Sequence, residues 1–376
     1  MDFDFDTPVD RAGTWSTRWE RHAGADVIPL WVADTDFRAA PAILEALAAR
    51  AAHGVFGYST PPPELRGAIV RRMQQRYGWR IDASWIVFIP GVVPGLHLAA
   101  RHLVPADGHA LIPRPVYHHF RKAMELAPRA FSEAPLVLES GRWVFDIDAL
   151  KRSINAKTRA FFLCNPQNPG GTVFRRAELE RLAEVTRDLV IVSDEIHCDL
   201  VLEPELRHVP IASLAPEISR RTVTLMSANK TFNIPAAGCG WAIIEDARLR
   251  SAFSAEVAGH VIGSPSVFGM AATLAALERC DEWLAALLDY LRGNRDLVEK
   301  EIGFPMAHVE ATYLAWIDCS AIEDAAGLFL KHGVSVYSGA QFGDARFIRL
   351  NFGTQRSRLQ EALRRIRNAS RPSPKG

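Results

Sequence analysis

The chain has 376 residues, of which 48 % are hydrophobic and 23 % charged, and its formal net charge is +1. This composition is typical of a globular protein with two domains, or with one large and one smaller domain. The small net charge gives no support for nucleic acid or an acidic membrane surface as a partner. No stretch reaches the ~18 uninterrupted apolar residues of a membrane span.

The N-terminus and the cysteines predict a cytoplasmic protein. MDFDFDTPVD has neither the basic nor the apolar region of a secretory signal. An odd number of cysteines without CxxC spacing indicates reduced thiols, and the histidines lack the spacing of metal ligands, so we expect no metal site. The cysteines are Cys164, Cys198, Cys239, Cys280 and Cys319.

Short apolar runs alternate with amphipathic helical patterns through the middle of the chain, which is typical of an α/β domain. Most of these runs are apolar throughout, as expected for strands buried on both faces of a mainly parallel sheet. The predicted strands are Trp85–Ile89, Ala110–Ile112, Ala160–Leu163, Leu189–Val192, Thr222–Leu225 and Trp241–Ile244. The helices predicted between them include Tyr117–Leu126, Asp146–Ile154 and Arg176–Arg187.

After Ser266 the pattern predicts a smaller α+β domain. A long helical region, Ser266–Glu301, contains Gly293–Asn294, which we expect to bend it or to end one of two helices. The tail SRPSPKG is predicted to be disordered. The elements expected in between are strand Thr312–Ile317, helix Ala321–Lys331, strands Val334–Tyr337 and Phe347–Leu350, and helix Gln355–Asn368.

The first forty residues show no clear periodicity and are expected to pack onto the smaller domain. We therefore predict an N-terminal segment at 1–40, a large domain at 41–265 and a small C-terminal domain at 266–376.

Two charged residues follow neighbouring apolar strands. Asp194 ends the run that begins LVIV, and Lys230 follows the run TVTLMSA, 36 residues later (230 − 194), about one helical crossover. Alone, Asp194 is more simply a helix N-cap and Lys230 a lysine on a surface turn. Together they would meet at the edge of the sheet where open α/β folds bind ligands.

This pair suits the chemistry of pyridoxal 5′-phosphate (PLP). A lysine in apolar surroundings has a lowered pKa and forms Schiff bases readily. A carboxylate can keep the pyridine nitrogen protonated, so that the ring accepts electrons from a carbanion. We therefore interpret Lys230 and Asp194 as catalytic residues that also hold PLP.

Other strand ends supply the remaining parts of such a site. Asn168, in the extended turn NPQNPGG, is a candidate donor to the phenolic oxygen of the ring. Val92 and Val93 open a helix after a glycine turn and could bind phosphate through their N–H groups, with a hydroxyl from Ser227. Tyr117 could stack on the ring. Each of these signals, taken alone, also fits an ordinary loop, an ordinary glycine turn or a core aromatic residue. The sequence contains neither GxGxxG nor GxxxxGK[ST], which argues against a dinucleotide or a nucleoside triphosphate as the ligand.

Taken together, these residues resemble the fold-type-I PLP enzymes of the aspartate-aminotransferase superfamily, and within it the cystathionine β-lyase group known as MalY/PatB. The resemblance runs through almost the whole chain. Its landmarks are WVADTDF (31–37), FGYS (56–59), PGVVPGL (90–96), NPQNPGG (165–171), SDEIHCDL (193–200), SANKTFNIP (227–235) and FIRLNFG (347–353).

The resemblance implies roles for individual residues. Lys230 would bind the cofactor as a Schiff base and move protons, and His197 would lie near the phenolic oxygen beside Asn168. Tyr58 would reach the phosphate in the partner subunit, which implies a homodimer with shared active sites. Arg349 would clamp the substrate carboxylate in a bidentate contact, and Ala33 and Asn168 would also contact the substrate. Tyr117 would be both catalytic and stacked on the ring.

The resemblance implies a carbon–sulfur β-lyase that converts an S-substituted cysteine to pyruvate, ammonia and a thiol. A PLP-dependent aminotransferase is the alternative, and a non-catalytic regulator with the same fold is a reading of a different class. Gln167 stands where the lyases usually have histidine, and only Gly343 remains in a shortened segment between Phe342 and Phe347. Gly238 stands where aminotransferases often have arginine, which favours the lyase group.

Overall fold

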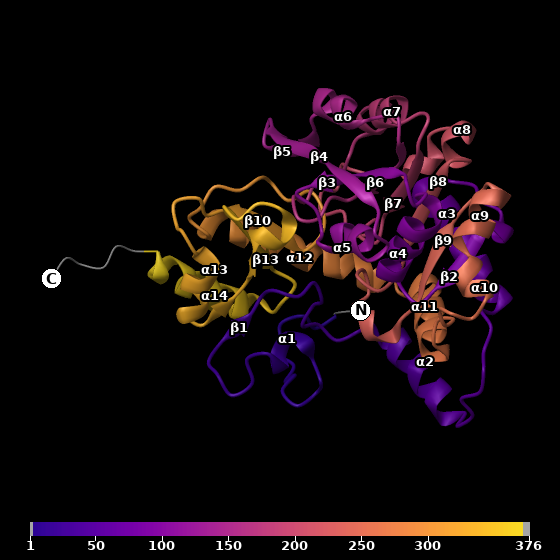
Figure 1. The fold of residues 1–376 in the computed structure, drawn as a ribbon. Helices are drawn as coiled ribbons and strands as arrows, with labels where there is room; N and C mark the ends of the chain where they lie inside the picture. The colour runs from indigo at the N-terminus through magenta and orange to yellow at the C-terminus, as the bar shows by residue number, and fades with distance from the viewer. Residues whose placement is uncertain (1–2, 371–376) are drawn as a thin grey trace.

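The computed structural model describes residues 3–370, so the tail after Ser370 lies outside the described residues. Its centre is a sheet of eight strands with helices on both faces (Figure 1). In spatial order the strands are β2 (Ile86–Ile89), β9 (Gly240–Ile243), β8 (Thr222–Met226), β7 (Val190–Asp194), β6 (Thr158–Cys164), β3 (His109–Arg114), β4 (Ala130–Glu139) and β5 (Arg142–Phe145).

The core of this sheet is parallel, as the apolar runs predict: β8, β7, β6, β3 and β4 all run in one direction. β9 is antiparallel to both of its neighbours, which corrects the expectation that Trp241–Ile244 continues the parallel run. The chain passes from β8 to β9 through a turn and the short 3-10 helix Pro235–Ala237. Without a helical crossover it can only return in the opposite direction.

The hairpin of β4 and β5 at the far edge was not predicted. Its turn, Ser140–Gly141, has positive φ at both residues, which is the geometry of tight hairpin turns. The last three residues of β4 are exposed, and the strand begins with the mixed sequence AFSE.

Alternate residues of β6 supply two separate cores. Ala160, Phe162 and Cys164 pack under α4 (Val92–Leu103) and α5 (His119–Leu126). Phe161 and Leu163 face the other way, toward α6 (Ile147–Ser153) and α7 (Arg176–Val185). A strand buried on both faces explains why its sequence is apolar without alternation.

A third core covers the antiparallel edge of the sheet. Leu65 and Met73 of α3 (Pro63–Tyr77) pack with Phe88 of β2 and Trp241 of β9. Helix α2 (Pro41–Ala52) and α11 (Val267–Arg279) lie beside each other, and α11 also packs on α3. Neither α2 nor α3 was predicted from the sequence.

The long helical region after Ser266 breaks at Cys280, between α11 and α12 (Asp281–Glu301). The prediction of a bend or end at Gly293–Asn294 is therefore wrong. Gly293 lies inside α12, and its missing side chain leaves room for Arg356, whose guanidinium nitrogen would lie 2.6 Å from a Cβ. Asn294 is buried and donates to the carbonyl oxygens of Phe352 and Thr354 at 3.0 and 2.8 Å.

The C-terminal part forms its own antiparallel sheet, in the order β10 (Leu314–Asp318), β13 (Phe347–Asn351), β12 (Tyr337–Ser338). Helices α13 (Ala325–Lys331) and α14 (Arg356–Ala369) cover it. The N-terminal segment packs here as expected, since β1 (Ile28–Pro29) pairs with β11 (Val334–Ser335). The domain boundaries at 40 and 265 remain a prediction.

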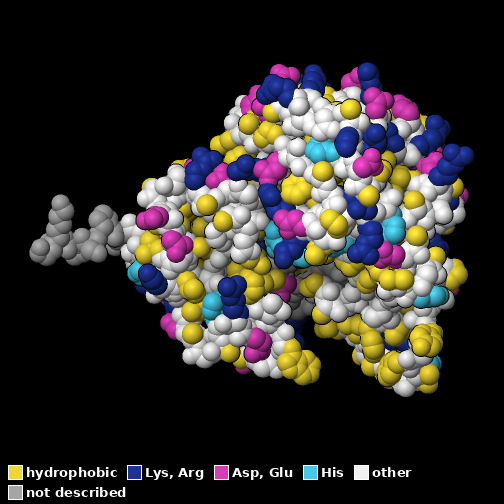
Figure 2. All heavy atoms as spheres, in the orientation of Figure 1, with side chains coloured by type: hydrophobic (Ala, Val, Ile, Leu, Met, Phe, Trp, Pro, Cys, Tyr) yellow, Lys and Arg dark blue, Asp and Glu magenta, His cyan; other side chains and the backbone are white. Residues whose placement is uncertain are grey.

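The remaining elements are short. They are α1 (Thr17–Glu20), α8 (Pro216–Ser219), α9 (Ala247–Phe253), α10 (Ala255–Ala258) and the 3-10 helices Ala83–Trp85, Ile211–Ser213 and Gly339–Phe342. No helix within residues 3–370 is long and apolar enough to cross a membrane. On the face seen in Figure 2, Lys and Arg side chains are interspersed with Asp and Glu rather than gathered in a patch of one sign.

Candidate active site

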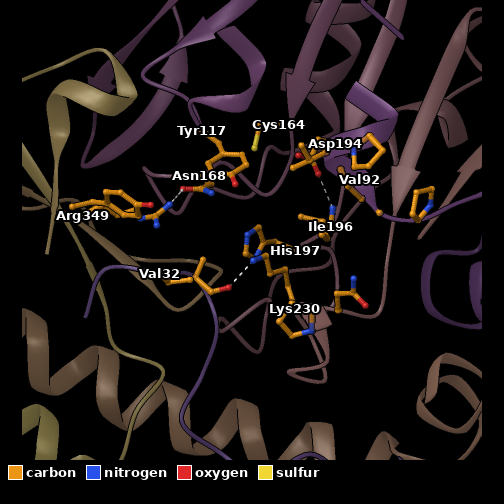
Figure 3. A pocket seen from close by; sticks show the side chains of 18 residues that line it. Val32, Val92, Tyr117, Cys164, Asn168, Asp194, Ile196, His197, Lys230 and Arg349 are labelled. Carbon is orange, nitrogen blue, oxygen red and sulfur yellow. Dashed lines mark hydrogen bonds between the residues drawn. The ribbon is translucent and has the colours of Figure 1, made fainter. Parts of the chain in front are cut away.

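A cavity of about 250 Å³ opens at the carboxyl ends of the central strands, between the large sheet and the C-terminal part of the chain (Figure 3). This is where open α/β sheets bind ligands. Of the residues predicted to form the site, nine line the cavity: Ala33, Val92, Val93, Tyr117, Asn168, Asp194, His197, Lys230 and Arg349.

Asp194 is the last residue of β7, which pairs in parallel with β8. Its carboxylate therefore lines the cavity at the carboxyl end of the strand. It is 5 % exposed and accepts a hydrogen bond from the N–H of Ile196 at 3.1 Å. Burial raises the pKa of Asp194 to about 7, against the lowering effects of that N–H and of Lys230. A positively charged group bound beside it would lower the pKa and keep the carboxylate ionised.

Lys230 lies in the turn that follows β8, one strand away from Asp194. Its Nζ donates to the carbonyl oxygen of Ala33 at 2.6 Å. Burial lowers the pKa of this amine to about 8; the negative charge of Asp34 opposes the shift and Arg349 adds to it. An amine with such a pKa is partly neutral near pH 7 to 8, the form that attacks carbonyl carbons and accepts protons.

Arg349 reaches the cavity from β13 and is 1 % exposed. Its guanidinium donates to Asn168 Oδ1 at 3.1 Å and to the carbonyl oxygen of Trp31 at 3.0 Å, and it lies over the rings of Tyr337 and Phe342 at 5.0 and 4.6 Å. Burial lowers its pKa to about 10. Among the described residues no carboxylate lies within 4.0 Å of it, and its Nε has no hydrogen-bond partner. A buried cation without an acidic partner is suited to bind an anion.

The contact with Arg349 orients Asn168. Because Oδ1 accepts from the guanidinium, the amide nitrogen is the end left to donate into the cavity. The backbone of Asn168 is held in turn, since its carbonyl oxygen accepts from the N–H of Tyr117 at 3.1 Å. Helix α5 consequently begins at His119, two residues later than predicted, and Tyr117 lies in the turn before it.

His197 follows Asp194 by three residues and is 2 % exposed. Its Nδ1 is buried and has no hydrogen-bond partner within residues 3–370. Burial lowers the pKa of this imidazole well below its ordinary value, with further lowering by Lys230 and Arg349. The ring is therefore neutral near pH 7, and one nitrogen is unpaired beside the cavity.

Helix α4 begins at the cavity wall. Its N-cap, Gly91, has no side chain to cap the first N–H groups, so those of Val92 and Val93 are unpaired by helix geometry and can bind an anion. The N-cap packs closely against β9, where position 240 must be glycine because a Cβ on Gly240 would lie 3.0 Å from the Cα of Gly91.

Two predicted residues lie outside this cavity. Ser227 Oγ donates to the carbonyl oxygen of Cys239 at 2.6 Å and accepts from the N–H of Asn229, so its hydroxyl is engaged elsewhere. Tyr58 is fully exposed and does not line the cavity. Their phosphate contacts, for Tyr58 in a partner subunit, remain predictions.

Sequence reasoning missed several residues that line the cavity. Tyr337 comes from a two-residue strand of the C-terminal sheet, and only tertiary packing reveals its position. Asn229, next to Lys230, could have been found from its neighbour; its Oδ1 is buried without a partner. The lining residues not predicted are Val32, Pro90, Gly91, Pro94, Cys164, Ile196, Asn229, Pro235 and Tyr337.

A buried pair lies immediately behind Asp194. Glu195 is 0 % exposed and its Oε2 lies 2.7 Å from Nε2 of His208, which is itself 4 % exposed. Its other oxygen accepts from the hydroxyl of Ser193 at 2.8 Å. Neither side chain of the pair occupies the main cavity wall beside Lys230, so we interpret the pair as support for the end of β7.

The residues fit PLP on the evidence of their unpaired groups. The amine of Lys230 suits the aldehyde carbon of PLP, and the carboxylate of Asp194, on the adjacent strand end, suits the pyridine nitrogen. The free amide N–H of Asn168 suits the phenolic oxygen. The unpaired N–H groups at the start of α4 suit the phosphate.

Comparison with known proteins agrees with this geometry. Residues 25–366 match the family model described as aminotransferase class I and II. The chain is 35 % identical to cystathionine β-lyase PatB of Bacillus subtilis, covering 97 % of this chain and 99 % of that one. The crystal structure of OvoB matches with a TM-score of 0.96 and 42 % identity over 99 % of this chain and 100 % of the other. Cystalysin of Treponema denticola, whose crystal structure contains PLP, matches with a TM-score of 0.93 and 29 % identity over 98 % and 99 % of the two chains. The chain therefore belongs to the aminotransferase class I and II family.

Proposed function

We propose that this protein is a PLP-dependent carbon–sulfur β-lyase, which converts an S-substituted cysteine and water to pyruvate, ammonia and a thiol. The observation that carries the proposal is the grouping of Lys230, Asp194 and an acid-free Arg349 in one buried cavity. The naming of a similar protein as a cystathionine β-lyase supports it.

PLP, when bound here, would supply an electron sink that stabilises negative charge at the substrate Cα. Arg349 binds the substrate carboxylate, and its two present acceptors, Asn168 Oδ1 and the Trp31 carbonyl, fix the direction of the guanidinium. Lys230, with its pKa lowered by burial, takes the Cα proton. The same side chain then holds that proton close to the departing sulfur.

Asp194 and Asn168 would hold the cofactor ring, and Asn168 does so beside Arg349. Asp194 holds a proton at the pyridine nitrogen, which maintains the electron demand of the ring. Asn168 donates its free amide N–H to the phenolic oxygen. The nearly complete burial of Asp194 strengthens its interaction with the ring, because few water molecules screen it.

Gly238 supports elimination rather than transamination. This is the position where aminotransferases often have arginine, and its φ of +59° is a conformation that side chains other than glycine rarely adopt. An arginine would be strained here. The alternative, an aminotransferase, is favoured by the name of the matching family model and by similar proteins that are named aminotransferases.

We also propose a cytoplasmic homodimer with shared active sites. Exposed apolar side chains support a second copy as partner: Val55, Phe56 and Tyr58 are 64 %, 56 % and 113 % exposed, and Leu44 is 46 % exposed. Hydrophobic atoms gather at the lower edge of the larger lobe in Figure 2, where Figure 1 places α2. All five cysteines are free and buried, which suits a reducing compartment.

A product assay tests the proposed reaction. The purified protein with PLP is incubated with cystathionine and with a panel of S-substituted cysteines, without any keto acid. We expect pyruvate, ammonia and thiol in equal amounts, and none of them from Lys230→Ala. Activity that requires a keto-acid acceptor and releases no thiol would establish the aminotransferase instead.

A further inference from the structure

The segment 31–37 lies along one side of the cavity, and on the side that faces Lys230 it is held through its main-chain carbonyl groups. The carbonyl oxygen of Ala33 accepts from Lys230 Nζ at 2.6 Å and from the hydroxyl of Tyr313 at 3.0 Å. On the side of the C-terminal sheet, Asn351 donates to the carbonyl oxygens of Val32 and Asp34. The segment therefore belongs structurally to that sheet, yet it contacts the amine of Lys230.

One side chain joins this segment to the turn that carries Lys230. Asn233 Oδ1 accepts from the N–H of Thr35 at 2.9 Å, and its Nδ2 donates to the carbonyl oxygens of Thr35 and Phe37 at 3.0 and 2.8 Å. The side-chain amide thus pairs with the segment as a neighbouring strand would. The side-chain oxygen and both N–H groups of the Asn233 amide are therefore used in hydrogen bonds to this segment.

Asn233 is rigidly connected to Lys230. The turn is closed by two backbone hydrogen bonds, from Phe232 N–H to the Ala228 carbonyl and from Ile234 N–H to the Asn229 carbonyl, both at 3.0 Å. Asn233 has a φ of +54°, a conformation that asparagine tolerates better than most residues. The strained turn directs its amide at Thr35 while Lys230 points at Ala33, two residues earlier in the same segment.

We propose that Asn233 is a positioning residue for Lys230: it fixes segment 31–37 so that the Ala33 carbonyl holds the lysine amine in place. The inference rests on the proposed function in one respect: it requires that Lys230 is the group that moves the Cα proton. A lysine side chain has a flexible stem, and proton transfer requires a fixed distance between donor and acceptor. A displacement of about 1 Å can slow such a step about 100-fold.

The test uses the full-length protein with PLP and L-alanine, which has a Cα proton but no leaving group. Loss of the Cα hydrogen in D₂O, followed by NMR, measures proton removal without elimination. Asn233→Gly removes the amide and keeps a residue that accepts the positive φ. We expect it to slow exchange by about 10- to 100-fold with half-saturation by alanine changed less than about 3-fold.

A second measurement needs no catalysis. Hydrogen–deuterium exchange at the Thr35 amide, in protein without substrate, should become at least about 10-fold faster in Asn233→Gly, because that N–H loses its acceptor. Ser140→Gly is the matched control: Ser140 also has positive φ, in the hairpin between β4 and β5, and we expect wild-type values for both measurements.

Asn233→Asp is the second variant, in case Asn233→Gly does not fold. It keeps the size of the side chain and removes the donor to two carbonyl oxygens, so alanine exchange should again slow. Wild-type alanine exchange in either folded variant would overturn the proposal, whatever happens at Thr35. If the wild-type protein exchanges alanine but releases no pyruvate from thioethers, the lyase proposal fails and the test of Asn233 stands.

Discussion

Replacing Lys230 by methionine should stabilise the protein without cofactor while it abolishes the chemistry. Burial lowers the pKa of Lys230 from 10.5 to about 8. That fall corresponds to a destabilisation of the native state of about 3 kcal/mol at pH 7, where the amine is charged in both the folded and the unfolded chain. Methionine has a similar length and no charge. Methionine cannot donate to the carbonyl oxygen of Ala33, and the loss of that hydrogen bond costs about 1 kcal/mol. The carbonyl oxygen is not left unpaired, because it still accepts from the hydroxyl of Tyr313.

The net expectation is a gain of about 2 kcal/mol at pH 7. For a chain of 376 residues the entropy of unfolding is about 0.8 kcal/mol/K, so Tm should rise by about 2–3 °C. The sign reverses with pH. Between the folded pKa of about 8 and the ordinary value of 10.5 the unfolded chain binds the proton more tightly, so the wild type gains stability as pH rises and the advantage of the variant disappears.

Differential scanning calorimetry of cofactor-free protein from pH 7 to 10.5 measures both effects. Lys157→Met removes an exposed lysine and serves as the control, with no change in Tm that depends on pH. If Lys230→Met were less stable than the wild type by a constant amount at every pH, the interpretation of Lys230 as a costly buried amine would be refuted.

Three further substitutions test the site and its support. Asp194→Ala should retain PLP, seen in the absorbance spectrum, and lose at least ~100-fold in kcat; an unimpaired enzyme would contradict its place at the pyridine nitrogen. Arg349→Ala should raise KM roughly 10- to 100-fold, from about 1.5–3 kcal/mol of charge-assisted bonding, whereas Arg346→Ala, exposed on the same strand connection, should not; equal KM values would remove Arg349 from the substrate. Glu195→Ala should lower stability by on the order of 1–3 kcal/mol, measured as a fall in Tm, since it leaves His208 buried without its hydrogen-bond partner; an unchanged Tm would show that the pair does not support the end of β7.

Much of the fold follows from the sequence because burial on both faces of a strand leaves a clear mark. The apolar runs that became β6, β7 and β8 were found, and with them the parallel order that brings Asp194 and Lys230 to one sheet edge. Turn chemistry at the strand ends indicated Asn168, Val92 and Val93, whereas His197, Arg349 and Ala33 were expected from the family resemblance.

What the sequence could not predict depends on contacts between distant segments. The glycine at position 293 lies inside a helix, where the guanidinium of Arg356, 63 residues later (356 − 293), occupies the space that a Cβ would need. The direction of β9 depends on the lack of a helix in the connection from β8, and the hydroxyl of Ser227 is directed away from the cavity by the Cys239 carbonyl. Tyr337 enters the cavity from a strand of two residues, too short for any periodicity to show.

The segment 31–37 has a consequence for how this site could change in evolution or by design. Its carbonyl groups, and not its side chains, bind Lys230, Arg349 and Asn351. The carboxylates of Asp34 and Asp36 pair with Arg11 and Arg18 and so constrain those two positions, whereas at Val32 and Ala33 the hydrogen bonds come from the main-chain carbonyl oxygens alone. Val32 and Ala33 line the cavity and are therefore free to vary in size. Libraries restricted to these two positions should reshape the space available to a substrate while the catalytic amine and its supports keep their places.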